Sequence, residues 1–150
     1  MSEPIATNKK ALRDYFFVDR WECGIALSGG EVKSIRAGEV NFADSFARIQ
    51  KEEVFLYNLH ISPYTQASYM NEDVTRPRKL LLHKKEIRKI IGVVAQKHLI
   101  LVPTKIYFSK RGFVKVELAA GRGKKAFDKR DDMKKREVER GLQRRLRMKR

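Results

Sequence analysis

The sequence predicts a mainly β fold in which short strands form a closed or partly closed antiparallel barrel with a few flanking helices. Several short segments alternate apolar and polar residues, which is typical of half-buried strands. The chain has 150 residues, of which 42% are hydrophobic, so it is long enough for one domain with its own core. Closure would remove exposed strand edges, and OB-type barrels are small barrels of this kind that bind nucleic acid.

The first part of the chain predicts one long strand and one short helix. Aromatic and aliphatic residues run through Asp14–Leu27, which indicates a long and partly buried strand. Residues 28–38 predict a turn and then a short helix, which has Val32 and Ile35 on one side and ends at Gly38.

Residues 40–50 are ambiguous between helix and strand. Three large residues have helical spacing, and three small residues alternate as they would on one face of a strand. The large ones are Phe42, Phe46 and Ile49, and the small ones are Ala43, Ser45 and Ala47. We favour the strand. Val54–Ile61 predicts a clearer strand, with one face formed by Phe55, Tyr57, Leu59 and Ile61.

The second half of the chain predicts one helix and a set of strands. Lys84–Gln96 has apolar residues at helical spacing and basic residues on the other side, so we expect an amphipathic helix. Strands are expected at Leu99–Val102 and Ile106–Phe108. A four-residue turn at 109–112 then leads into a strand at Phe113–Leu118.

Charge is the strongest clue to a partner. The formal net charge is +16, and a compact domain does not need such an excess. Residues 121–150 carry 14 Lys and Arg against 5 Asp and Glu, so more than half of the excess lies in this tail. We expect a flexible lead-in over 1–12, a barrel over 13–122, and a basic tail over 123–150 that is disordered when free and helical on a partner.

Other classes of protein are disfavoured by the same residues. Cys23 is the only cysteine and the three histidines are far apart in sequence, so we expect neither a disulfide nor a zinc site, and no cofactor. A match to the dinucleotide fingerprint at 121–126 precedes a charged segment that cannot pack as a crossover helix. The start of the chain lacks the apolar core of a signal peptide and no apolar run could span a bilayer, so we expect a cytoplasmic protein without a membrane partner.

Two basic segments favour RNA as the partner. Residues 76–86 carry six cations, among them His83, around three leucines, and this density favours phosphate contacts over a merely solvated rim. In the tail, Phe127 is flanked by basic residues, and an aromatic ring beside cations is typical of a site where a base stacks. A solubility tail or an import signal remains an alternative for the tail.

Five motifs in order resemble the SmpB family, also called SsrA-binding proteins or small protein B. They are Gly30–Gly38 (GEVKSIRAG), His60–Tyr64 (HISPY), Arg78–Lys84 (RKLLLHK), Leu101–Pro103 (LVP), and Gly123–Arg130 (GKKAFDKR). The resemblance implies an OB-like barrel and an adaptor, not an enzyme. Such an adaptor binds the tRNA-like domain of transfer-messenger RNA (tmRNA, SsrA RNA) and delivers it, with elongation factor Tu, to stalled ribosomes for trans-translation.

The resemblance also implies where the partners bind. RNA contacts in the body would come from Glu31, Lys33, Ser34, Arg36, Arg78, Lys79, His83 and Lys84. Contacts with the small-subunit decoding centre and the empty mRNA channel would come from Lys124, Lys125, Phe127, Asp128, Lys129 and Arg130. Phe127 stands where the family usually has Tyr or His, so it can stack but cannot donate a hydrogen bond. We expect a monomer. A metal-dependent nuclease using Asp14, Asp19 or Asp44 and a structural ribosomal protein are the alternatives.

Overall fold

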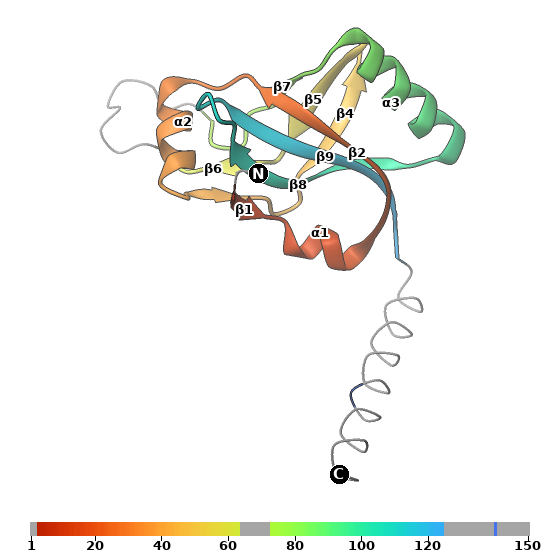
Figure 1. Ribbon diagram of the computed structural model, residues 1–150, viewed down its shortest axis with the longest axis horizontal. Helices are drawn as coiled ribbons and strands as arrows, with labels where there is room; N and C mark the ends of the chain where they lie inside the picture. The colour runs from red at the N-terminus through yellow and green to blue at the C-terminus, as the bar shows by residue number, and fades with distance from the viewer. Residues whose placement is uncertain (1–2, 64–72, 125–139, 141–150) are drawn as a thin grey trace.

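The computed structural model describes residues 3–63, 73–124 and Arg140. In these ranges the chain is mainly β, with a large antiparallel sheet and a few short helices, and the predicted fold class is confirmed (Figure 1). In chain order the elements are β1 (Pro4–Thr7), α1 (Lys9–Asp14), β2 (Tyr15–Ile25), α2 (Gly29–Arg36), β3 (Val40–Asn41), β4 (Phe46–Gln50), β5 (Glu53–Tyr57), β6 (His60–Ile61), β7 (Arg78–Leu81), α3 (Lys84–Lys97), β8 (Ile100–Phe108) and β9 (Val114–Gly123).

The large sheet closes on itself. Its strands lie in the order β1-β8-β4-β5-β7-β2-β9, and β9 also pairs with β8, which completes the ring. β9 covers one edge of β8 from Ile100 to Phe108. The other edge is shared, because β1 pairs near Tyr107 whereas β4 pairs only through Ala47 and Leu101. We call this weakly paired junction of β4 and β8 the seam.

The core fills the ring and is capped by α3. Leu56, Ile106 and Leu118 are fully buried on strands from three parts of the ring. Ile90 of α3 is 0% exposed, so the apolar side of this helix faces the barrel as its spacing predicted. No helix in the described part of the chain is long and apolar enough to span a membrane.

The N-terminal region differs from the flexible lead-in expected over 1–12. Here β1 pairs with β8, and α1 follows directly. Asn8 fixes the junction, because its side chain accepts a hydrogen bond from Ala11 N at 3.1 Å and donates one to Pro103 O at 2.8 Å. Pairing to β8 is a long-range interaction that local sequence pattern does not reveal.

Two predicted strands are broken by residues with positive φ. The strand favoured for 40–50 is present as β3 and β4, which are separated by a turn with Ala43 at φ 38°. The single strand predicted for Val54–Ile61 is wrong, because Asn58 at φ 62° separates β5 from β6. The predicted common face is therefore split: Phe55 and Tyr57 are half-buried, whereas Leu59 and Ile61 are buried.

The last two strands are longer than predicted. β8 continues through Pro103, where its register against β9 shifts, instead of ending before the proline. β9 continues to Gly123, beyond the expected end at Leu118. At Gly121 the strands approach so closely that a Cβ atom would lie 2.3 Å from the carbonyl oxygen of Phe16.

Candidate nucleic-acid interface

The start of α2 is fixed by a reciprocal cap. Ser28 Oγ accepts a hydrogen bond from the Glu31 backbone N–H at 3.3 Å, and the Ser28 N–H donates to Glu31 Oε1 at 3.0 Å. Gly29 and Gly30 form the first turn between them. Glu31 therefore caps the N-terminus of α2, and its hydrogen bond with Ser28 holds the carboxylate in one orientation.

The same carboxylate forms a buried ion-pair cluster with two arginines that follow in sequence much later. Arg78 Nε donates to Glu31 Oε2 at 2.6 Å, and Arg76 donates to Oε1. The Arg78 guanidinium also donates to Leu59 O at 2.6 Å and to Val74 O at 3.0 Å. The Arg78 side chain is 0% exposed and that of Glu31 is 8% exposed. The cluster therefore ties α2 to β7 and to the segment before it.

The electrostatics of this cluster favour a charged Glu31. Burial by itself would raise the pKa of Glu31, but hydrogen bonds from the Ser28 N–H, Arg76 and Arg78 together outweigh it. The pKa is therefore lowered below the usual value of 4.5. A carboxylate that accepts this many donors has little capacity left for a ligand.

The outer side of α2 presents cations. Lys33 and Arg36 are exposed, whereas Ser34 and Ile35 of the same helix are buried. The Arg36 guanidinium lies 5.3 Å from the centre of the Phe108 ring, at the end of β8. The ring limits where this guanidinium can point, so it presents a partly ordered charge to a partner.

The second group of predicted residues lies at the other end of β7. Lys79, His83 and Lys84 are all exposed. Lys79 pairs with Glu53 at 3.1 Å, and the His83 N–H donates to Glu86 at the start of α3. Figure 1 shows α2 and α3 at opposite ends of the body, with β7 running between them. The exposed members of the predicted body set therefore lie on two surfaces, whereas Glu31, Ser34 and Arg78 are buried.

Of the predicted tail residues, only Lys124 lies in the described part of the chain. Its backbone N–H donates to Asp14 O at 2.7 Å, and its Nζ atom lies 4.7 Å from the centre of the Phe16 ring. The expectations for Lys125, Phe127, Asp128, Lys129 and Arg130 lie outside the described residues. The structure thus fixes the point from which the tail starts.

Arg76 is the residue of the α2 cluster that the sequence did not single out. It belongs to the same cation-rich segment as Arg78, and nothing in the local pattern separates an arginine that binds a buried carboxylate from one that faces solvent. The burial of Arg78 could have been predicted from the sequence, because residues alternate along a strand and Arg78 lies on the same face as the apolar Leu80.

The acids proposed for a nuclease site are dispersed. Asp14 pairs with Arg13 at 3.4 Å and Asp44 pairs with Lys10 at 3.3 Å. Asp19 accepts a hydrogen bond from the Arg20 N–H. Among the described residues, no group of three or more His, Cys, Asp or Glu side chains is placed to hold a metal ion.

Comparison with known proteins identifies the family. The model of the SmpB protein family matches residues 5–148. The chain belongs to the SmpB family. It is 54% identical over 145 residues to the SsrA-binding protein of Caldanaerobacter subterraneus subsp. tengcongensis, covering 97% of this chain and 91% of that protein. It is 55% identical over 138 residues to the SsrA-binding protein of Thermosipho melanesiensis, covering 92% and 94%.

A solved SmpB structure resembles this one. It comes from work described as "tmRNA-SmpB: a journey to the center of the bacterial ribosome", and it shares 54% sequence identity with this chain. The TM-score is 0.69, and the match covers 83% of this chain and 87% of the other. The family resemblance drawn from the five sequence motifs is confirmed.

Proposed function

We propose that this chain is an adaptor that binds the tRNA-like domain of tmRNA and brings it to stalled ribosomes for trans-translation. Membership of the SmpB family carries the proposal, together with relatives that are named for binding SsrA RNA. The solved relative is described with tmRNA and the bacterial ribosome, which supports both partners. The function is one of binding and delivery, with no chemical step.

On the α2 surface, exposed and buried residues have different roles in this proposal. Lys33 and Arg36 contact RNA phosphates, because both are exposed and positively charged. Glu31, Ser34 and Arg78 are positioning residues, since all three are buried and Glu31 and Arg78 are engaged with each other. A rigid helix that presents cations at fixed spacing suits a folded RNA, which is recognised by its shape more than by its sequence.

The second surface, at the start of α3, adds further phosphate contacts. Lys79, His83 and Lys84 are exposed there, and α3 continues with the exposed cations Lys85 and Arg88. Glu53 and Glu86 are the acids in contact with this group. We assign to this surface a region of RNA that α2 cannot reach, because the two helices lie at opposite ends of the body (Figure 1).

The tail is assigned to the ribosome. In this proposal Lys124, Lys125, Lys129 and Arg130 bind ribosomal RNA phosphates, Phe127 stacks on a base, and Asp128 begins a helix in the empty mRNA channel. Messenger RNA in the channel would exclude the tail, so occupancy selects stalled ribosomes. Elongation factor Tu completes the delivery complex, and one copy of the chain acts in the cytoplasm.

Ending the chain after Lys124 tests this division of labour. The truncated chain keeps the last β9 pairs and the Lys124–Asp14 hydrogen bond, so we expect a folded body that binds tmRNA as the full chain does. Peptide tagging on ribosomes stalled in a reconstituted translation system should be lost. Equal loss of binding and tagging, with the body folded by circular dichroism, would contradict separate roles for body and tail.

A further inference from the structure

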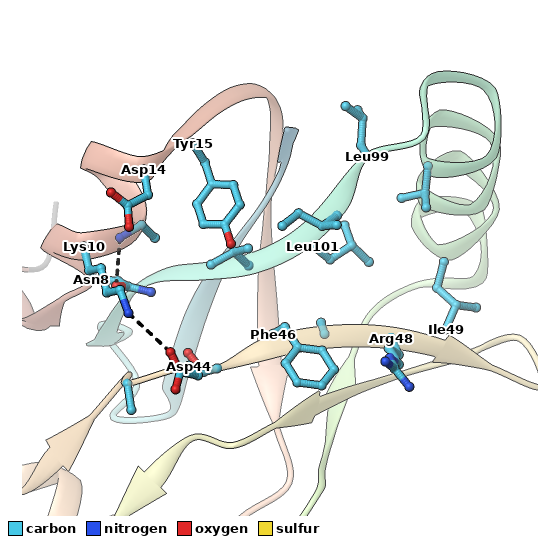
Figure 2. A pocket seen from close by; sticks show the side chains of 17 residues that line it. Asn8, Lys10, Asp14, Tyr15, Asp44, Phe46, Arg48, Ile49, Leu99 and Leu101 are labelled. Carbon is cyan, nitrogen blue, oxygen red and sulfur yellow. Dashed lines mark hydrogen bonds and ion pairs between the residues drawn. The ribbon is translucent and has the colours of Figure 1, made fainter. Parts of the chain in front are cut away.

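A pocket of about 600 Å³ lies at the seam, where the ring of strands is least tightly closed. β4 and β8 are paired there only through Ala47 and Leu101. Residues of α1, the first residue of β2 and Val94 near the end of α3 complete the walls (Figure 2). Its volume is in the range of pockets that bind small molecules, roughly 300–1,000 Å³. We call it the seam pocket.

The lining is mostly apolar and includes two aromatic rings. Leu99, Leu101 and Val94 form an aliphatic wall. Tyr15 of β2 and Phe46 of β4 lie on opposite sides of the pocket in Figure 2. Both rings are half-buried. The Phe46 ring already stacks on Tyr57 of β5, with 5.5 Å between the ring centroids, so a flat apolar group would meet only the surface of Phe46 that Tyr57 leaves uncovered.

One buried polar atom in the lining has no partner. Ser45 is 6% exposed, and its Oγ atom makes no hydrogen bond within the described part of the chain. An unsatisfied buried hydroxyl costs about 1–3 kcal/mol, so such groups usually have a partner. Because Ser45 lines the seam pocket, a ligand with a polar edge would supply that partner.

The charged groups of the lining balance. Lys10 and Asp44 form an exposed ion pair at 3.3 Å, and Arg48 stands with its guanidinium 5.1 Å from the Phe46 ring. With Asp14 the lining holds two acids and two bases. This balance gives no net attraction to the segment 125–150, which carries twelve basic and five acidic residues. It suits a flat neutral group attached to a single anionic group, which the Arg48 guanidinium can bind.

A nucleobase on its sugar-phosphate has this chemistry. We infer that the seam pocket binds one unstacked base of an RNA partner, between Tyr15 and Phe46, with the Ser45 hydroxyl on the base edge and Arg48 on the adjacent phosphate. Proteins that read unpaired nucleotides combine aromatic surface, edge hydrogen bonds and a cation in this way. The inference rests on the proposed RNA-binding function and adds a site that is separate from the cations of α2 and from those at the start of α3.

Methyl NMR of the full chain, labelled at Ile, Leu and Val, tests the site. The probes are single-stranded RNA hexamers of uridine or adenosine and an abasic ribose-phosphate hexamer of equal charge. We expect the methyl signals of Ile49, Val94 and Leu101 to shift saturably with at least one base-bearing hexamer. They should not shift with the abasic one, because only the base enters the pocket.

Two variants and a matched control locate the binding. Phe46→Leu should weaken the binding of the hexamer by roughly tenfold, through loss of stacking surface. Ser45→Ala should weaken it by about three- to tenfold, through loss of one hydrogen bond, and it leaves the aromatic walls unchanged. Phe55→Leu is the control: Phe55 pairs opposite Arg48 on β5, is also half-buried, and does not line the pocket. It should bind the hexamer as the unchanged chain does.

Three results would overturn the inference. They are equal shifts with the abasic hexamer, no shift with any hexamer, and occupation of the pocket by the chain's own tail. The last is measured by a nitroxide on Leu142→Cys, which would broaden the pocket methyl signals without RNA; Cys23 is buried and does not compete for the label. Failure of the proposed function is distinct, because it appears as loss of tmRNA binding while the hexamer results are unchanged.

Discussion

Replacing Arg78 with methionine should lower the free energy of unfolding of the body far more than the same replacement of an exposed cation would. The variant keeps most of the side-chain volume but removes every donor. Glu31 loses one of its two guanidinium partners, and the carbonyl oxygens of Leu59 and Val74 lose the donors that lie 2.6 and 3.0 Å away. Breaking a buried ion pair by removing one partner typically costs about 3–5 kcal/mol. Glu31 keeps Arg76, so we expect a cost toward the lower end of that range.

Lys79→Met is the matched control for this prediction. Lys79 is the next residue on β7, and its ion pair with Glu53 has side chains that are 45% and 46% exposed. Exposed pairs contribute about 0–1 kcal/mol, so this variant should unfold close to the unchanged chain. Both variants replace with methionine a basic residue of β7 that pairs with a glutamate, and the two pairs differ in burial.

Urea unfolding followed by circular dichroism gives the free energy of unfolding of each variant. Arg78→Met should lower the midpoint with little change in slope, and it should also weaken tmRNA binding because α2 loses its attachment to β7. If Arg78→Met and Lys79→Met differ by less than about 1 kcal/mol, the cluster does not hold α2 in place and the reasoning from burial fails.

Three further predictions concern pH, thiol reactivity and salt. The folded pKa of Glu31 is lowered, so its contribution to stability is present above the usual value of 4.5 and is lost as pH falls through the folded pKa. The unchanged chain should therefore lose more stability than Glu31→Gln between about pH 5 and about pH 3 in urea unfolding; equal slopes would contradict the assignment. Burial raises the pKa of the Cys23 thiol to about 12. Ellman's reagent at pH 8 should therefore react with Cys23 only as fast as the native protein unfolds locally, whereas a fast reaction would show that the thiol is accessible. Lys33→Gln and Arg36→Gln should each reduce the slope of log affinity for tmRNA against log salt by about 1, whereas Lys97→Gln, at the far end of α3, should leave the slope unchanged.

The two helices α2 and α3 could be predicted, because their positions follow from the spacing of apolar residues and from turn residues nearby in the sequence. The helix expected at Lys84–Gln96 is α3 at Lys84–Lys97, because its apolar spacing alone determines which side packs on the barrel. The turn, short helix and glycine stop expected over residues 28–38 correspond to α2 at Gly29–Arg36. The family resemblance then supplied the function, which neither charge nor periodicity could specify.

What the sequence could not predict depends on long-range pairing and on single backbone angles. One residue in the left-handed region, Asn58, reverses which side chains face the core. Asparagine adopts positive φ more often than most residues, but residue type alone does not show where it does so. Arg78 was assigned to phosphate because it stands among cations, yet its partner Glu31 lies 47 residues earlier in the sequence. A buried partner so distant in the chain becomes visible only in three dimensions.

The fixed starting point of the tail makes the body a spacer of defined length. Lys124 is held beside Asp14 next to the Ile100 end of β8, whereas Arg36 of α2 lies against Phe108 at the other end of that strand. A strand of this length spans about 26 Å. Beyond Lys124, the remaining 26 residues reach about 39 Å if helical and at most about 90 Å if extended. In the proposed function, RNA bound at the α2 surface would therefore be kept at a constant offset from Lys124. The conformation of the tail would then set how far from Lys124 its own contacts lie.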